Sequence, residues 1–324
     1  TRVRSSAASD VYKRQAYFCT KDSFMTPVKA WVSAARLRTL PLSVSGIIVG
    51  SAMAYNSGFF RWDICILALL ATLGFQILSN FANDYGDGVK GTDNHERIGP
   101  ARAMQSGLLT AKQLKNGMVF TASVTLLISI ALIYTAFGSE RFLESVLFFV
   151  LGLLAILAAV KYTVGKSAYG YMGLGDLFVF IFFGLVAVAG SYYLYAAQLD
   201  AVVFLPALTV GFLSIAVLNL NNMRDRLSDA RAKKNTLAVF LGPKKSKFYH
   251  YFLIVGALVA SLLFFHFTNT YLWSVIACVV FIPLGKHLAY VAQNESPALL
   301  DPELKKVALA TFFFSVLFTL GFLF

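Results

Sequence analysis

Apolar residues occupy long windows of the chain, such as Met118 to Phe137, Leu177 to Ala197 and Phe248 to Phe267. A helix needs about 20 apolar residues to cross the hydrocarbon of a bilayer, and each window is long enough. The windows lack the alternation of apolar and polar positions that membrane barrel strands require. We predict an all-α polytopic membrane protein with helices near residues 40–57, 62–83, 115–137, 142–162, 173–197, 201–222, 248–268, 271–292 and 307–324.

The composition agrees with a membrane environment. Of 324 residues, 58% are hydrophobic and only 14% are charged, whereas a soluble domain has about 25% charged residues. The three cysteines Cys19, Cys65 and Cys278 lie far apart without CxxC spacing, and the histidines are equally dispersed. Neither a disulfide framework nor a zinc site is therefore indicated.

The distribution of charge predicts the orientation of the helices. With nine spans the loops alternate between two faces, and the loops of one face carry only Arg61 and Arg141 as basic residues. Basic residues are much more numerous on the other face: Lys90, Arg97, Arg102, Lys112, Lys115, Lys161, Lys166, Arg224, Arg226, Arg231, Lys233, Lys234, Lys244, Lys245 and Lys247. The positive-inside rule makes this face cytoplasmic. The net charge of +12 is thus a topology signal and predicts no nucleic-acid partner.

The first 24 residues differ from the rest of the chain. The letters SSAASDVYKRQ, from Ser5 to Gln15, resemble translated sequencing-adaptor read-through, and Met25 opens a segment typical of a natural start. The stretch before Met25 lacks the apolar core of a signal peptide. We expect residues 1–24 to be a non-native or disordered extension and residues 25–324 to form one domain.

Two predicted cytoplasmic loops, Asp84 to Lys112 and Arg224 to Lys247, are longer than a connection requires. The first begins with NDYGDGVKGTD, where Asn83 and Asp87 share one face if the preceding helix continues. The second begins within NNMRDRLSD, where amide and carboxylate side chains again recur at intervals of four. Each segment alone is compatible with an ordinary helix end, because Asp, Asn and Gly are common there. The pair favours function, because carboxylates facing a membrane interior are costly.

The chemistry of these side chains favours a hard cation. Carboxylate and amide oxygens with few histidines or thiols nearby are typical Mg²⁺ ligands. A carboxylate repels a diphosphate, so the two can bind each other only through a bridging metal. Basic neighbours would neutralise the remaining phosphate charge: Lys90, Arg97, Arg102, Arg224 and Arg226.

A third cytoplasmic loop has the letters YTVGKSAYGYMGLGD, from Tyr162 to Asp176, and combines cations, phenols and glycines. Lys166 and Tyr162 are candidates for contact with substrate. Asp176 is a candidate site residue, although a carboxylate at the first turn of a helix is also stabilised by the helix dipole alone.

These segments resemble one known family. NDYGDGVKGTD, RIGPARAMQSG, YTVGKSAYGYMGLGD and NNMRDRLSDA are similar to motifs of UbiA-type intramembrane prenyltransferases, specifically the 1,4-dihydroxy-2-naphthoate polyprenyltransferase (MenA-type) branch. The likeness also includes ARLRTLPLS and FFGLVAVAGSYYL. It implies a bundle around a central cavity that opens to the cytoplasm and to lipid, in a bacterial inner membrane.

The resemblance, together with the side-chain chemistry, implies a role for each candidate residue. The implied Mg²⁺ ligands are Asn83, Asp84, Asp87, Asp93, Asp225 and Asp229. The implied substrate-binding residues are Asn83, Lys90, Arg97, Arg102, Lys166, Arg224, Asn221 and Arg38, the last with membrane anchoring as an alternative. The catalytic candidates are Asp87, Asp225, Asp176 and Tyr162. Of these, Asp176 or Tyr162 would orient or deprotonate a hydroxyl of the acceptor.

The implied reaction transfers a polyprenyl group from polyprenyl diphosphate to 1,4-dihydroxy-2-naphthoate, releases CO₂ and diphosphate, and gives demethylmenaquinone. It uses Mg²⁺ and needs no obligatory protein partner. Within the family, 4-hydroxybenzoate and homogentisate are alternative acceptors.

Two further classes share some of these features. An ion-coupled transporter is the main alternative, although its acidic residues would be expected near the membrane midplane. A CDP-alcohol phosphotransferase is disfavoured, because Asp87-Gly88 is not followed by Ala-Arg at the required offset.

Overall fold

The computed structural model describes residues 27–93, 98–270 and 275–323. The predicted extension 1–24 and the candidate Arg97 lie outside the described residues. Within these three ranges, nine helical segments are long and apolar enough to cross a membrane. The predicted all-α membrane class is thus confirmed.

The helices have the following bounds. The long helices are α3 (Leu40–Asn56), α4 (Trp62–Lys90), α5 (Ala111–Phe137), α6 (Phe142–Lys161), α9 (Phe204–Arg231), α10 (Leu237–Thr268), α12 (Phe281–Gln293) and α13 (Asp301–Leu323). The short segments are α2 (Pro27–Ala35), η1 (Leu37–Thr39), η2 (Tyr169–Tyr171), α7 (Gly175–Val179), η3 (Phe180–Gly190), α8 (Ser191–Ala196), η4 (Ala201–Val203), η5 (Val275–Val280) and η6 (Pro297–Leu300). α7, η3 and α8 run on as one span, in which η3 has π-helical geometry.

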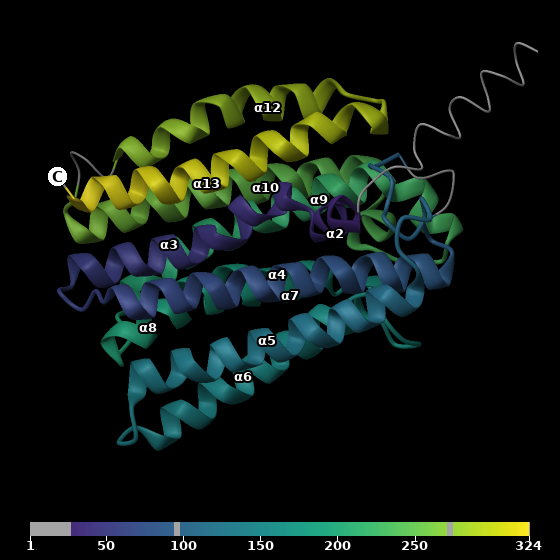
Figure 1. The fold of residues 1–324 in the computed structure, drawn as a ribbon. Coiled ribbons are helices and arrows are strands. Elements are labelled where there is room, and N and C mark those ends of the chain that lie inside the picture. Colours follow the sequence, from purple (N-terminus) through teal and green to yellow (C-terminus); the bar gives the residue numbers. More distant parts are fainter. Residues whose placement is uncertain (1–26, 94–97, 271–274, 324) are drawn as a thin grey trace, which may run out of the picture.

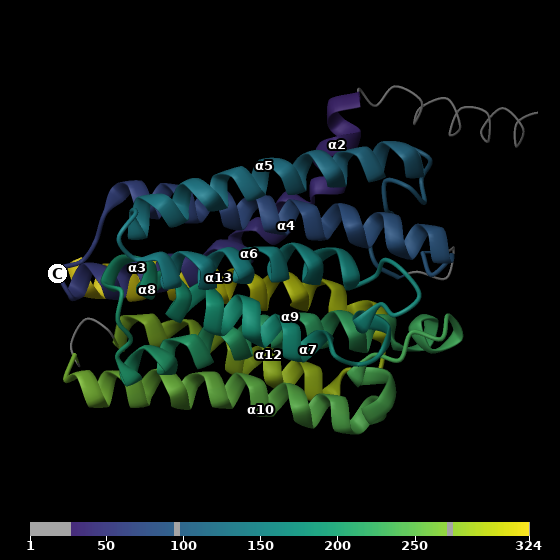
Figure 2. The same cartoon turned by 90° about the horizontal axis from the view of Figure 1, so that it is seen from below.

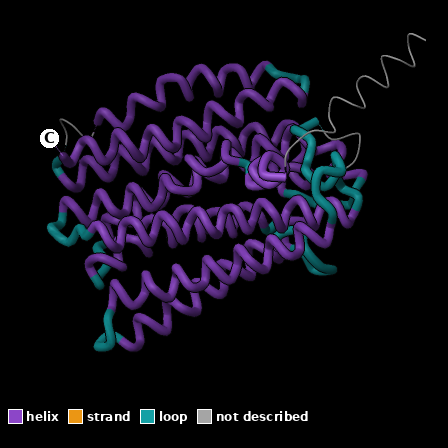
Figure 3. The backbone as a smooth tube through the Cα atoms, in the orientation of Figure 1, coloured by secondary structure: helices purple, strands orange, loops and turns teal. Residues whose placement is uncertain are grey.

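The long helices lie side by side as a bundle. α10, α12 and α13 form one side and α5 and α6 the other, with α3, α4 and α9 between them (Figure 1). Seen from below, α5 and α10 lie at opposite edges (Figure 2). The longer loops gather at one end of the bundle, and the C terminus lies at the other (Figure 3).

The helix ends explain where the acidic segments lie. α4 continues to Lys90 and α9 to Arg231, so both segments are helical rather than parts of loops. α10 begins at Leu237, well before the predicted position near residue 248, and it is interrupted at Gly242, whose φ is 73°. This interruption precedes Pro243, which cannot donate a helical hydrogen bond. The Gly-Pro pair therefore marks a kink inside α10 and not its start.

Small residues allow the central helices to approach closely. A Cβ atom added to Gly184 of η3 would lie 2.8 Å from the Ala207 carbonyl oxygen of α9. A Cβ added to Gly46 of α3 would lie 2.4 Å from Cβ of Ala187. Such contacts are typical of membrane helix packing, where close backbone approach replaces the hydrophobic effect as the source of stability. They fix α3, η3 and α9 around the site described below.

A buried polar chain joins α10, α12 and α13. His250 Nε2 lies 2.8 Å from His287 Nε2, and His287 Nδ1 lies 2.5 Å from Glu303 Oε2. All three residues are at most 2% exposed. Polar contacts between membrane helices stabilise them by roughly 1 kcal/mol each. The chain thereby holds the first turn of α13, which also carries Asp301, beside its neighbours.

Candidate active site

The first acidic segment forms the last turns of α4. Asn83, Asp84 and Asp87 are helical, and the left-handed conformation of Gly91 (φ 72°) ends the helix. Asp84 and Asp87 are nearly inaccessible, with exposed fractions of 1% and 2%. Buried carboxylates are costly unless they are paired, so their partners indicate what each can do.

Asp84 binds the loop that follows α4. Its Oδ2 accepts a hydrogen bond from the backbone N–H of Ala103 at 3.0 Å, and its Oδ1 accepts one from Met104 at 3.1 Å. Both carboxylate oxygens thus hold the loop against α4. This geometry supports a positioning role for Asp84, and its role as a Mg²⁺ ligand stays a prediction.

Asp87 contacts a phenol and an ammonium group. The Tyr171 hydroxyl donates to Asp87 Oδ1 at 2.7 Å, and Lys234 Nζ lies 3.5 Å from Asp87 Oδ2. Because the Tyr171 hydroxyl donates to Asp87, the Thr92 hydroxyl is the donor to Tyr171 at 2.6 Å. Asp87 is therefore linked to η2 and to the connection between α9 and α10.

The second acidic segment, on α9, is held by its own arginine. Arg224 donates from Nε to Asp225 Oδ1 at 2.9 Å and from Nη2 to Asp225 Oδ2 at 2.6 Å. It also donates to Asn221 Oδ1 at 2.7 Å and to Asp301 at the start of α13. Arg224 is only 2% exposed. The predicted phosphate-binding arginine is thus paired with carboxylates in this structure.

Lys234 brings the two acidic segments together. Its ammonium nitrogen lies 3.5 Å from Asp87 Oδ2 of α4 and 3.9 Å from Asp229 Oδ1 of α9. Two carboxylates that are 142 residues apart in sequence thus lie within 4 Å of one nitrogen atom. We predict that the two acidic segments meet at one mouth of the bundle. That prediction requires carboxylates of both segments to lie this close together.

Two further candidate cations lie beside the first segment. Lys90 Nζ lies 3.9 Å from the centroid of the Tyr171 ring, within cation–π distance. Arg102 Nε lies 3.6 Å from Oδ2 of Asp93, whose side chain is fully buried. Lys90 therefore lies beside Tyr171, the phenol that donates to Asp87. Arg102 and Asp93 lie beside each other.

The remaining candidates differ in exposure. Asn83 faces the internal cavity, and its Oδ1 lies 3.4 Å from the Thr163 hydroxyl. Lys166 and Arg38 are exposed. Their predicted phosphate contacts stay predictions.

Tyr162 and Asp176 lie close to each other on the loop and the helix that follow α6. Tyr162 lines the cavity, and Asp176 is 6% exposed. Burial first, and then the charges of Asp176, Asp87 and Asp229, raise the pKa of Tyr162 above its usual value. Its phenol therefore stays protonated near neutral pH, which suits a hydrogen-bond donor better than a base. Asp176 Oδ1 is buried and has no hydrogen-bond partner among the described residues.

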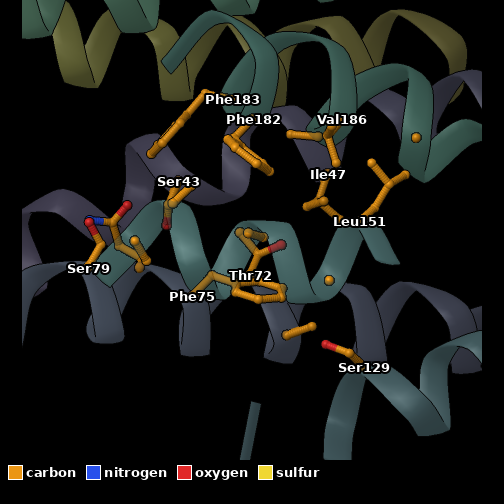
Figure 4. A pocket seen from close by; sticks show the side chains of 18 of the residues that line it. Ser43, Ile47, Thr72, Phe75, Ser79, Ser129, Leu151, Phe182, Phe183 and Val186 are labelled. Atoms are coloured by element: carbon orange, nitrogen blue, oxygen red, sulfur yellow. The ribbon is translucent and has the colours of Figure 1, made fainter. Parts of the chain in front are cut away.

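An apolar cavity of about 340 Å³ leads into the bundle from Asn83 and Tyr162. It follows α4 from Asn83 to Ala68, a helical distance of about 22 Å at 1.5 Å per residue. Figure 4 shows side chains from five helical segments around it: Ser43, Ile47, Thr72, Phe75, Ser79, Ser129, Leu151, Phe182, Phe183 and Val186. Its shape and lining suit a long hydrocarbon chain.

The acidic segments suit a hard divalent cation whose remaining ligands come from the substrate. Among the described residues, no three acidic, histidine or cysteine side chains are grouped as a ready metal site. Mg²⁺ usually takes one or two carboxylates from the protein and fills its other positions with water and phosphate oxygens. Asp87 and Asp229 supply such carboxylates and already share a cationic partner.

Sequence reasoning missed Tyr171, Lys234 and Asp301 as site residues. Tyr171 belongs to a loop that the sequence singles out, but nothing in its spacing distinguishes it from Tyr162 or Tyr169. Lys234 counted only toward the charge of the cytoplasmic face. Asp301 lies 77 residues after Arg224, so no local pattern connects the two.

Comparison with known proteins identifies relatives over nearly the whole chain. A 1,4-dihydroxy-2-naphthoate octaprenyltransferase of Haemophilus influenzae is 44% identical over 299 residues, which cover 91% of this chain and 96% of the relative. The Escherichia coli protein of the same name is 42% identical over 90% of this chain and 94% of the relative.

A solved structure has the same fold. A UbiA homolog from Archaeoglobus fulgidus, bound to Cd²⁺, superposes with a TM-score of 0.61 at 14% identity and covers 89% of this chain and 99% of its own. With dimethylallyl diphosphate (DMAPP) and Mg²⁺ bound, the homolog superposes with a TM-score of 0.53 at 17% identity, covering 87% and 98% of the two chains. The sequence profile of the UbiA prenyltransferase family matches residues 43–300. The chain therefore belongs to the UbiA prenyltransferase family.

Proposed function

We propose that this protein transfers a polyprenyl group from polyprenyl diphosphate to 1,4-dihydroxy-2-naphthoate in menaquinone biosynthesis. The observation that carries the proposal is the meeting of two acidic segments, at Asp87 and Asp229, near the mouth of a long apolar cavity. The names of the bacterial relatives specify the acceptor.

The donor fits this arrangement end to end. Its prenyl chain would lie in the cavity along α4, and its diphosphate would lie at the acidic mouth. Asn83, Asp87, Asp225 and Asp229 are the residues that would hold Mg²⁺ there. The Archaeoglobus homolog solved with DMAPP and Mg²⁺ supports the choice of metal. When bound, Mg²⁺ would neutralise charge on the diphosphate and assist its departure.

The chemistry requires no nucleophilic side chain. The allylic C–O bond breaks, and diphosphate leaves with the bonding electrons. The electron-rich naphthoate carbon that bears the carboxylate then forms the new C–C bond. Loss of CO₂ returns an electron pair to the ring, so the immediate product is the dihydroxy (quinol) form of demethylmenaquinone, and no oxidant is needed. The protein's contribution is to position both substrates and to exclude water.

Aromatic rings near the mouth can protect the cationic allylic fragment. The rings of Tyr169 and Phe178 stack with centroids 3.9 Å apart, and Tyr162 meets Tyr169 edge-on at 5.3 Å. Tyr162 and Phe178 both line the cavity. Aromatic faces stabilise cations, and a water-poor lining prevents their hydrolysis.

Tyr162, which lines the cavity, and the nearby Asp176 are the proposed residues that would orient the acceptor. The protonated phenol can donate to an oxygen of the naphthoate, and Asp176 Oδ1 can accept from one of its hydroxyls. The acceptor would thus be fixed between two polar groups of opposite hydrogen-bonding character.

The proposed setting is a bacterial inner membrane, with residues 25–324 as one domain and the site facing the cytoplasm. The excess of basic residues at the loops of one face supports this orientation. The nine long apolar helices found in the described parts of the chain support a multi-pass protein.

The decisive experiment uses purified protein in lipid vesicles with Mg²⁺, farnesyl or octaprenyl diphosphate and one aromatic acid at a time. We expect a prenylated, decarboxylated product only with 1,4-dihydroxy-2-naphthoate, identified by mass, and loss of turnover with EDTA. Preference for 4-hydroxybenzoate or homogentisate would overturn the proposed acceptor. Absence of any prenylated product, together with ion flux across the vesicles, would favour a transporter.

A further inference from the structure

Lys234 lies where a metal bridging the two acidic segments would be expected. Its ammonium contacts Asp87 of α4 at 3.5 Å and Asp229 of α9 at 3.9 Å. The residue is 8% exposed, and both aspartates are at most 5% exposed. The Tyr171 ring centroid lies 5.4 Å from the same nitrogen. The ammonium is thus enclosed by two carboxylates and an aromatic face.

This cation has a physical task in the absence of metal. Two buried carboxylates from different helices repel each other, and a buried charge without a partner is strongly destabilising. The ammonium of Lys234 compensates both. It therefore keeps the C-terminal ends of α4 and α9 together before Mg²⁺ and substrate arrive.

Lys234 differs from Arg224 in how it can be displaced. Arg224 makes a forked, bidentate contact with Asp225, whereas Lys234 offers a compact charge on a flexible four-carbon stem. The backbone N–H of Lys234 donates to the Asp229 carbonyl oxygen at 2.8 Å, so its main chain is anchored. The ammonium can therefore move while the backbone stays in place.

We propose that Lys234 is an internal substitute for the metal: its ammonium holds Asp87 and Asp229 together, gives way to Mg²⁺, and then binds the donor's diphosphate. The displaced ammonium remains within a side-chain length of the site, where the diphosphate provides the nearest new negative charge. This inference rests on the proposed function for the identity of the phosphate ligand. Lys234 would then be both a positioning residue and a substrate-binding residue.

The first test measures Mg²⁺ alone, without substrate. In Lys234→Met the competing cation is absent, so we expect Mg²⁺ to bind about tenfold more tightly, whereas loss of a purely structural residue would not tighten binding. We also expect the metal-free variant to melt about 5 °C below the wild type, with the deficit removed by MgCl₂. Lys233→Met is the matched control, because it removes the same charge from the adjacent residue, which is exposed. Unchanged or weaker Mg²⁺ binding in Lys234→Met would overturn the proposal.

The second test measures binding of farnesyl thiodiphosphate, a slowly reacting donor analogue, with saturating Mg²⁺ and no acceptor. We expect Lys234→Met to bind it about tenfold more weakly than the wild type and Lys234→Arg to recover part of the loss. Equal affinity in Lys234→Met and wild type would refute transfer of the ammonium to diphosphate. Neither measurement requires turnover, so an error in the proposed aromatic acceptor would leave both results unchanged. If Lys234→Met fails to fold, Lys234→Gln repeats both measurements with a neutral polar side chain.

Discussion

The two acidic segments are alike in composition but are held in different ways. In the first, Asp87 contacts single donors: a phenol at 2.7 Å and an ammonium at 3.5 Å. In the second, both oxygens of Asp225 are engaged by one guanidinium. A monodentate contact with an ammonium is more easily exchanged than a buried bidentate pair with a guanidinium. Asp87 and Asp225 thus differ in how readily they can exchange their partners.

The same difference appears within each segment. Asp84 and Asp225 bind groups of the protein with both oxygens, and Asp87 and Asp229 share Lys234. One carboxylate of each pair thus binds protein groups with both oxygens, while the other contacts an ammonium that it shares with the opposite segment. Similar spacing in the sequence thus conceals different partners for the two carboxylates of each segment.

The largest effect is expected when an exchangeable carboxylate is removed. Asp87→Asn should lower kcat/KM by about 10³-fold or more, because the charge that would hold the metal and its diphosphate is lost. Product formation by mass spectrometry measures the loss, and size-exclusion chromatography checks that the variant is inserted and folded. Asp63→Asn, at the other end of α4, is the control. Turnover retained within tenfold in Asp87→Asn would contradict the metal assignment.

A smaller loss of activity but a large loss of stability is expected from Arg224→Met. Removing one partner of a buried ion pair leaves Asp225 uncompensated and costs about 3–5 kcal/mol. Activity should fall by about 10²-fold through misplacement of Asp225. Thermal unfolding in detergent measures the first effect, and Arg226→Met, two residues further along α9, is the control. A variant as stable as the wild type would show that the bidentate pair does not support the scaffold.

Much of the fold follows from the sequence, because nine apolar windows have the length that a bilayer demands. The ends of α4 and α9 do not follow, since Asn, Asp and Gly have low helix propensity and normally indicate a helix end. Here tertiary contacts override that preference. Asp84 and Asp87 are buried against other segments, and these contacts keep the last turns of α4 helical.

The candidate site is only partly predictable for a similar reason. The spacing of four residues correctly indicates that Asn83 and Asp87 belong to the same helical stretch. Their carboxylate and amide oxygens indicate a hard cation. The partners that distinguish the carboxylates, Tyr171, Lys234 and Asp301, come from segments that meet only in the folded protein. Charge counting assigns Lys234 to membrane topology, although it is almost fully buried.

Asp84→Asn tests whether Asp84 holds the loop that follows α4 in place. The amide can accept only one of the two backbone hydrogen bonds, so the loop at Ala103 and Met104 should loosen. We expect KM for the donor to rise about tenfold with kcat nearly unchanged, because a loosened loop weakens binding more than chemistry. Limited proteolysis should cleave this loop faster than in the wild type. A fall in kcat as large as in Asp87→Asn would instead place Asp84 among the metal ligands.

The smallest effect is expected from Tyr171→Phe, which removes one neutral donor from Asp87. A single hydrogen bond to a charged group contributes about 1.5–3 kcal/mol, and Lys234 remains, so a loss of about tenfold is expected. Burial, and next the charge of Asp87, raise the pKa of Tyr171 above its usual value of 10.0. The phenol therefore keeps its proton up to pH 10, and its contribution is lost only as pH rises through the higher pKa of the folded state. The ratio of wild-type to Tyr171→Phe activity should stay constant from pH 7 to about 9.5. A ratio that falls within this range would mean that Tyr171 ionises there and that its contact with Asp87 depends on pH.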